Sequence, residues 1–233
     1  MNPLAKFIAW CLDLVFPQTC VSCRQEGEYL CESCRGRLAP QVPSCPVCSR
    51  RNFTGILCAS CAETAGLRRF LAPFSYRDPL ARDLVHAFKY EGARELAPLL
   101  AGEIAGCLAA YAIRPIASSL LVPIPLSRAR LRERGFNQSE LLASELAKRL
   151  GLPVARALRR RRDTASQIEM TSYKERRRNV SDAFRVRDPD AVRNRPVILV
   201  DDVSTSGATL AEAARALRAA GARTVWAVVI AKG

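Results

Sequence analysis

One stretch near the C-terminal end decides the fold of this chain: Val197-Ile198-Leu199-Val200-Asp201-Asp202-Val203-Ser204-Thr205-Ser206-Gly207-Ala208-Thr209-Leu210. Its first four residues are apolar and mostly β-branched, and so short a run predicts a strand buried on both faces. Two carboxylates follow where that strand should reach the surface, and small hydroxyl residues around one glycine come next. An apolar-periodic segment, 208–220, then predicts a helix that ends at Gly221. This order predicts an α/β fold with a phosphate-binding turn at the carboxyl end of a strand.

The residue types of this turn suit a phosphorylated sugar. Backbone N–H groups and hydroxyls between Thr205 and Thr209 can donate to a phosphate, and the helix N-terminus adds partial positive charge. Carboxylates repel a phosphate, so Asp201 and Asp202 suit vicinal ribose hydroxyls or a hydrated Mg²⁺. The alternative is an ordinary Asp-Asp turn. The hydroxyl residues and the helix that follow the acidic pair directly argue against it.

The composition fits one well-buried domain with a small appendage. The chain has 233 residues, of which 49% are hydrophobic. Its 36 Lys and Arg residues against 22 Asp and Glu residues give a formal net charge of +14. That excess predicts an anionic partner, whether nucleic acid, an anionic surface or a polyphosphate ligand. No apolar run is long enough to span a bilayer. We expect an amphipathic helix within residues 1–19 and no signal peptide, because Asp13 interrupts the apolar residues.

Eight of the ten cysteines form four C-x-x-C pairs, which is the spacing of zinc ligands: Cys20 and Cys23, Cys31 and Cys34, Cys45 and Cys48, Cys58 and Cys61. Two such knuckles supply the four thiolates of a tetrahedral site. Short loops of seven and nine residues separate the members of successive couples, which favours two consecutive Cys₄ sites. An interleaved cross-brace is the open alternative. We therefore predict a double zinc ribbon over residues 20–65, held by metal and placed in a reducing, cytoplasmic compartment.

Other segments outline the rest of an α/β domain over residues 66–233. Strands are expected at 69–76, 120–125 and 224–230, and helices at 80–90, 94–113 and from Asn137 to Leu150. A basic, glycine-bearing loop, residues 126–136, should join the second strand to the last of these helices. Its arginines, Arg128 and Arg134 among them, predict an anion clamp, with a solvated basic turn as the alternative. Lys89 on the first helix is a further candidate anion ligand.

A second basic segment covers residues 156–178, with nine basic and three acidic residues. Its composition fits either a mobile, solvent-facing loop or a nucleic-acid-binding arm. We interpret residues 159–178, around Gln167, as a candidate lid.

Taken together, these motifs resemble the ComF family, described as a zinc-ribbon module fused to a type I phosphoribosyltransferase domain and associated with DNA uptake in competent bacteria. The resemblance rests on the paired knuckles, Val122-Pro123-Ile124-Pro125, the Arg134-Gly135-Phe136-Asn137-Gln138 block and the stretch from Val197, which resembles the phosphoribosyl-diphosphate (PRPP) signature. It implies two structural zinc ions, and Mg²⁺ bound with PRPP. It implies these roles for the residues: Asp201 and Asp202 catalytic at the ribose; Thr205, Ser206, Gly207, Ala208 and Thr209 at the 5′-phosphate; Arg128, Arg134 and Lys89 at the diphosphate; Gln167 and Arg178 in the lid.

Two functions follow as hypotheses. The first is a PRPP-binding enzyme, although Thr205 stands where some purine-using members carry a carboxylate base. The second is a non-catalytic protein that binds single-stranded DNA, or other DNA-uptake proteins, and uses the fold as a scaffold. The net charge supports the second, but aromatic residues make up 6% of the chain and do not interleave with the arginines as in a stacking platform.

Overall fold

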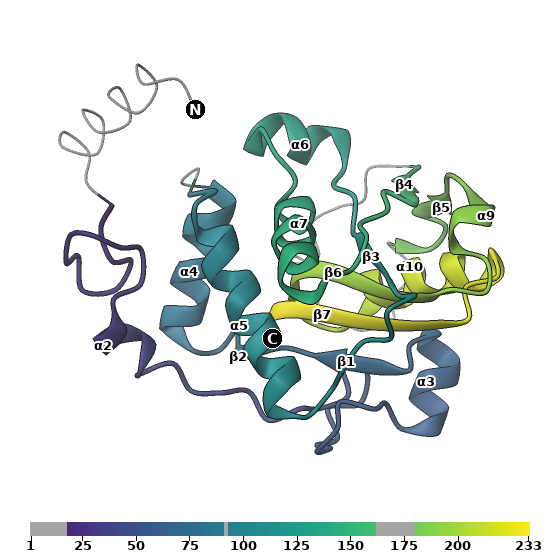
Figure 1. Ribbon diagram of the computed structural model, residues 1–233, viewed down its shortest axis with the longest axis horizontal. Coiled ribbons are helices and arrows are strands. Elements are labelled where there is room, and N and C mark those ends of the chain that lie inside the picture. The colour runs from purple at the N-terminus through teal and green to yellow at the C-terminus, as the bar shows by residue number, and fades with distance from the viewer. Residues whose placement is uncertain (1–17, 91–92, 162–179) are drawn as a thin grey trace.

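A parallel sheet forms the centre of the structure, a computed structural model that describes residues 18–90, 93–161 and 180–233. The strand order is β1-β7-β6-β3, and the short β2 pairs with β7 beyond β1 (Figure 1). All of these pairings are parallel. The strands are β1 (Arg69–Leu71), β2 (Phe74–Ser75), β3 (Leu120–Pro123), β6 (Pro196–Ser204) and β7 (Thr224–Lys232). The prediction of an α/β fold is confirmed.

The deciding stretch folds as its pattern predicts. Strand β6 continues past the apolar residues to Ser204, so the acidic pair lies within the strand near its carboxyl end. Helix α10 (Ala208–Ala219) follows and returns the chain to β7, which pairs with β6 in parallel. The strand expected at 69–76 is instead divided into β1 and β2 by Ala72-Pro73. Proline has no N–H for a sheet ladder, which explains the break.

Helices cover both faces of the sheet. On one face lie α4 (Pro79–Tyr90), α5 (Leu96–Ala110) and α7 (Gln138–Leu150), which share a hydrophobic core with Ile198 and Val200 of β6. On the other lie α3 (Ala59–Ala65) and α10, which share a second core with Val197 and Leu199. Successive residues of one strand therefore enter two cores, as expected for a strand buried on both faces.

The two cysteine-rich ribbons lie against opposite faces of the sheet. The first, residues 20–34 with α2 (Glu32–Arg35), shares the core of α4 and α5 through Leu30, and Arg35 forms a 2.6 Å ion pair with Glu103 of α5. The second, residues 45–61, buries Leu57 in the core of α3 and α10. In Figure 1 the chain passes from α2, beside α4, along the sheet to α3. Each ribbon therefore extends one of the two hydrophobic cores.

The basic segment after β3 is a correction to the expected loop. Residues Arg128–Arg134 form helix α6, whose N-cap Ser127 accepts a hydrogen bond from the Arg130 N–H. Gly135, in the left-handed conformation at φ 73°, ends the helix. The remaining elements are α9 (Pro189–Val192) and the antiparallel pair β4 (Leu158–Arg160) and β5 (Phe184–Val186). The structure holds no described helix with the length and apolar character needed to cross a membrane.

Candidate functional site

The eight predicted zinc ligands form two groups of four. One group is Cys20, Cys23, Cys31 and Cys34, the other Cys45, Cys48, Cys58 and Cys61, and the sulfur atoms of each group lie within 4.8 Å of one another. The pairing of consecutive knuckles is confirmed, and the cross-brace alternative is wrong. Sulfur pairs at 3.6 Å, Cys23 with Cys31 and Cys48 with Cys58, fit the edge of a tetrahedron whose metal–sulfur distance is about 2.3 Å.

Hydrogen bonds between thiols connect the cysteines of the second tetrad. A bound cation would take the place of the protons in these hydrogen bonds. Hydrogen bonds from the Cys61 and Cys48 thiols lower the pKa of Cys58 to about 7. Its partner Cys61 donates to Cys58, and its own pKa rises to about 12. Four thiolates this close repel one another unless a divalent ion lies between them. The donor set is all sulfur, which suits Zn²⁺.

The acidic pair lies at the carboxyl end of β6, one of the central strands of the sheet. The Asp201 carboxylate accepts hydrogen bonds at one oxygen, Oδ1, from the Ser139 hydroxyl and the Asp202 N–H, both at 2.9 Å. Burial, followed by the negative charge of Asp202, raises the pKa of Asp201 to about 7. Asp201 is therefore close to its titration point near neutral pH, and a cation placed beside it would favour its ionised form.

Two of the three predicted anion ligands meet the acidic pair. The Lys89 ammonium lies 3.0 Å from Asp202 Oδ1, and Arg134 Nη1 lies 3.9 Å from Asp202 Oδ2. Their side chains are 15% and 7% exposed and that of Asp202 is 11% exposed, so water screens these charges weakly. Without a ligand, Asp202 thus holds the two cations that the sequence assigns to an anion.

Three further residues hold this cluster, and the sequence alone did not single them out for it. Arg134 donates to the Tyr90 hydroxyl and to Gln138 Oε1, both at 3.1 Å. Its guanidinium also lies over the Tyr90 ring, 4.9 Å from the centroid. Ser139 orients Asp201. Gln138 and Ser139 begin α7, directly after the N-cap Asn137, so the Arg-Gly-Phe-Asn-Gln block was the available signal for them.

The hydroxyl-glycine turn connects β6 to α10 as predicted. Gly207 has a φ of 72° and forms the N-cap of the helix, a backbone conformation that favours glycine. The Oγ atoms of Ser204 and Ser206 are buried and have no hydrogen-bond partner in the described part of the chain. Buried hydroxyls normally have partners. This turn therefore offers unused hydrogen-bonding capacity at a helix N-terminus.

The second ribbon lies directly against this turn. A Cβ atom placed on Gly207 would come 3.1 Å from the Cβ of Pro46, which lies inside the third Cys-x-x-Cys knuckle. A side chain here would therefore be tightly packed against Pro46 as well as strained by the positive φ angle. The contact joins a zinc knuckle to the candidate phosphate turn.

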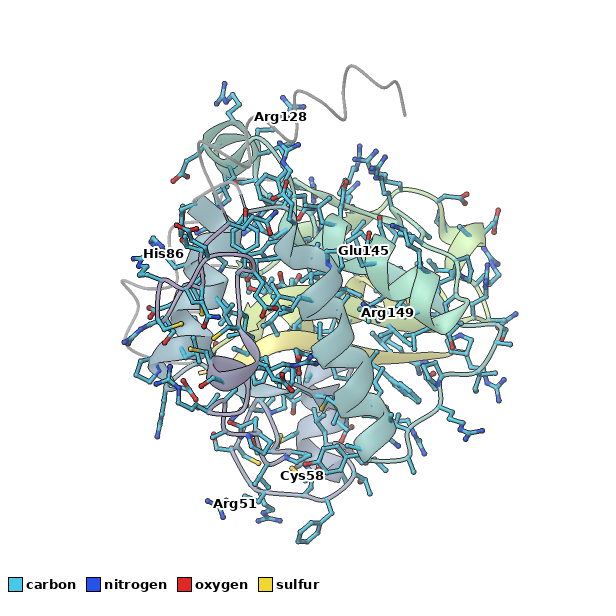
Figure 2. All side chains as sticks on the ribbon, turned by 60° about the vertical axis from the view of Figure 1, so that its left-hand side comes forward. Arg51, Cys58, His86, Arg128, Glu145 and Arg149 are labelled. Atoms are coloured by element: carbon cyan, nitrogen blue, oxygen red, sulfur yellow. The ribbon has the colours of Figure 1, made fainter. Side chains whose placement is uncertain are left out.

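Arg128, the third predicted anion ligand, lies elsewhere. It lines a cleft of about 1020 Å³ between α6, the start of α7 and the β4–β5 pair, where the other basic lining residues are Arg159, Arg160, Arg161 and Arg187. The one acidic lining residue, Glu140, forms a 3.0 Å ion pair with Arg156. Figure 2 shows Arg128 at the opposite end of the molecule from Arg51 and Cys58 of the second ribbon. The predicted lid residues, Gln167 and Arg178, lie outside the described residues.

Comparison with known proteins matches an N-terminal and a C-terminal part of the chain to two domain families. The phosphoribosyl transferase domain family matches residues 137–233, and the double zinc ribbon domain family matches residues 11–64. The DNA utilization protein YhgH of Salmonella typhi is 33% identical over 223 residues, which are 91% of this chain and 96% of that protein. The chain belongs to the ComF family. This ComF chain is also 29% identical over 198 residues to the competence protein ComFC of Bacillus subtilis, covering 82% of this chain and 78% of that protein.

A third ComF relative agrees with these two. Competence protein F of Haemophilus influenzae is 28% identical over 218 residues, covering 88% of this chain and 93% of that protein. The chain thus combines a phosphoribosyltransferase domain with an N-terminal double zinc ribbon, as the sequence predicts. The names of these relatives refer to DNA utilization and competence.

Proposed function

We propose that the carboxyl end of β6 binds PRPP together with Mg²⁺. One observation carries the proposal: the acidic pair and the hydroxyl-glycine turn are consecutive. Between the end of β6 and α10, the Ser204 and Ser206 hydroxyls are buried without a hydrogen-bond partner among the described residues. A 5′-phosphate is the ligand that uses such donors. We assign it to Thr205, Ser206, Gly207, Ala208 and Thr209.

We assign the ribose to the acidic pair and the diphosphate to the two cations beside it. Asp201 and Asp202 accept hydrogen bonds from the ribose hydroxyls, and their charge favours the Mg²⁺ that accompanies the diphosphate. Lys89 and Arg134 form ion pairs with Asp202, and we assign them also to the diphosphate, whose negative charge they would attract. Arg128 is assigned to the departing diphosphate. The segment that contains Gln167 and Arg178 is assigned to a lid.

Phosphoribosyl transfer requires little covalent chemistry from the protein. The bond between C1 of the ribose and the diphosphate oxygen breaks, and the diphosphate leaves with both bonding electrons while an acceptor atom attacks C1. Lys89 and Arg134 stabilise charge on the leaving group, and a closed lid excludes water. Asp201 and Asp202 fix the ribose while its ring carbon becomes electron-poor.

The arginine cleft favours a second function, the binding of single-stranded DNA. Five arginines line this cleft, and its single acidic side chain is already paired. Such a lining attracts a phosphate backbone. The relatives' names, which refer to DNA utilization and competence, are consistent with a role in DNA uptake. We place this function in the cytoplasm, where thiolates stay reduced, and propose other DNA-uptake proteins as partners. Arg128 is the one residue assigned to both functions, and the other residues of the two sites differ.

Calorimetric titration of PRPP with Mg²⁺ tests the first proposal. We expect saturable, Mg²⁺-dependent binding by the wild type and at least a tenfold weaker affinity in Asp201→Asn/Asp202→Asn. The matched control is Asp83→Asn/Asp190→Asn, which removes two carboxylates from exposed positions. Equal PRPP affinity in all three proteins would overturn the assignment. Single-stranded DNA binding should survive in the Asp201→Asn/Asp202→Asn protein, since it belongs to the cleft.

A further inference from the structure

A separate, smaller pocket lies between the second ribbon and the edge of the sheet. Its volume is about 350 Å³, within the usual size range of small-molecule sites. One wall comes from the ribbon and the segment before it: Gln41, Val42, Ser44, Ser49 and Arg51. The other comes from the ends of β2 and β7 and the residues after them: Ser75, Arg77, Lys232 and Gly233. In Figure 2, Arg51 and Cys58 of this ribbon are both labelled in the lower part of the molecule.

The pocket is lined by basic and hydroxyl groups. Arg51, Arg77 and Lys232 contribute positive charge, three serines contribute hydroxyls, and no Asp or Glu side chain is among the lining residues. Lys232 is only 8% exposed. No carboxylate side chain within the described ranges forms an ion pair with it. A buried ammonium without an ion-pair partner is costly, and burial lowers the pKa of Lys232.

The zinc site explains only part of this arrangement. Four thiolates around one Zn²⁺ leave a net negative charge, and two lining residues of the pocket, Ser44 and Ser49, are the sequence neighbours of Cys45 and Cys48. That negative charge accounts for one cation. It does not account for Arg51, Arg77 and the serine hydroxyls, which line the same hollow. A ligand anion satisfies all of them together.

We propose that this pocket binds a phosphate-bearing small molecule, with the second zinc ribbon as its roof. The pocket adjoins the candidate PRPP turn, because Lys232 pairs with Ser204 in the sheet and the Gly233 N–H donates to the Ser204 carbonyl at 3.0 Å. None of the lining residues is aromatic, so the pocket lacks the stacking surface that a nucleic-acid strand would use. A free phosphorylated molecule is the occupant that these groups favour.

Titration of the zinc-loaded full chain with inorganic phosphate, in the presence of PRPP and Mg²⁺ to occupy the candidate 5′-phosphate turn, tests the proposal. Lys232→Met keeps the length of the side chain and removes its charge, and we expect it to weaken phosphate binding at least tenfold. Arg77→Gln, at an exposed position, should weaken binding about threefold. The control Lys148→Met removes an exposed lysine of α7, 70% exposed, and should change the affinity by less than about twofold.

Three further results decide the matter. Phosphate affinity that is unchanged in Lys232→Met with both zinc ions retained would overturn the proposal. If that variant loses zinc, an unaltered phosphate affinity in Arg77→Gln would overturn it as well. A single-stranded oligonucleotide without terminal phosphate should show no dependence on Lys232, and a strong dependence would assign the pocket to nucleic acid instead. PRPP affinity is measured in parallel on the same variants, so failure of the PRPP site is detected separately.

Discussion

Replacement of Asp201 by Asn should stabilise the ligand-free protein at alkaline pH. The Asp201 pKa is raised from 3.8 to about 7, so the folded protein holds a proton that the unfolded chain has released. Stability therefore falls as the pH rises from about 4 to about 7, and the full cost remains above that range. Asn carries no charge and loses nothing over this window.

The structure sets the size of this effect. A shift of about three pKa units corresponds to an upper limit of about 4 kcal/mol. The half-buried position of Asp201 and the nearby Lys89 ammonium reduce the expected gain to about 1–2 kcal/mol, or roughly 2–8 °C in the unfolding temperature. Both hydrogen bonds to Asp201 reach Oδ1, which the Asn side chain retains. The substitution therefore isolates the charge.

Thermal unfolding of wild type and Asp201→Asn between pH 4 and pH 8 measures it. We expect the two unfolding temperatures to converge at the acidic end and the variant to be more stable at pH 8. Asp190→Asn, which changes an exposed residue, should show no such divergence. A gap that does not depend on pH, or a variant that is less stable at pH 8, would refute a raised pKa at Asp201.

Three other perturbations follow from the packing. Elemental analysis should find two zinc ions per chain, and chelation should lower the unfolding temperature of the whole chain, because Leu30 and Leu57 of the ribbons belong to the two cores; unfolding of the ribbons alone would contradict this. Gly207→Ala should lower the free energy of unfolding by about 1–2 kcal/mol, because of the positive φ and the contact with Pro46, and should weaken PRPP binding. If calorimetry finds neither effect, a close approach of the phosphate and Pro46 to this turn is excluded. Replacing Arg159 and Arg187 by Gln should reduce the slope of log K against log salt for single-stranded DNA by about 0.7 for each phosphate that the protein no longer neutralises, and an unchanged slope would exclude the cleft.

The sequence predicts this protein best where the pattern is local. The buried strand, its acidic pair and the helix from Ala208 lie within one continuous stretch, and hydrophobic period and turn chemistry specify them directly. The zinc pairing is equally local, because short loops leave few ways to combine the knuckles. The sequence predicts a loop where helix α6 lies, although Ser127 and Gly135 mark the ends of the helix. Its dense arginines are interpreted as an anion-binding loop rather than as a helix.

The rest of the site depends on contacts between distant residues. Tyr90 meets Arg134 across 44 positions, and Ser139 meets Asp201 across 62. The approach of Pro46 to Gly207 and the pocket around Lys232 likewise require the ribbon to be folded onto the sheet. Period and spacing carry no information about such pairs, which the packing of helices and ribbons determines.

Amide hydrogen exchange with and without PRPP and Mg²⁺ tests the central claim most directly. The account predicts that saturating ligand slows exchange across residues 201–209, with a smaller effect at the end of α4 around Lys89, and that Mg²⁺ alone gives neither change. Protection confined to the ribbons or to α6, or no change at a PRPP concentration that calorimetry shows to be saturating, would contradict it.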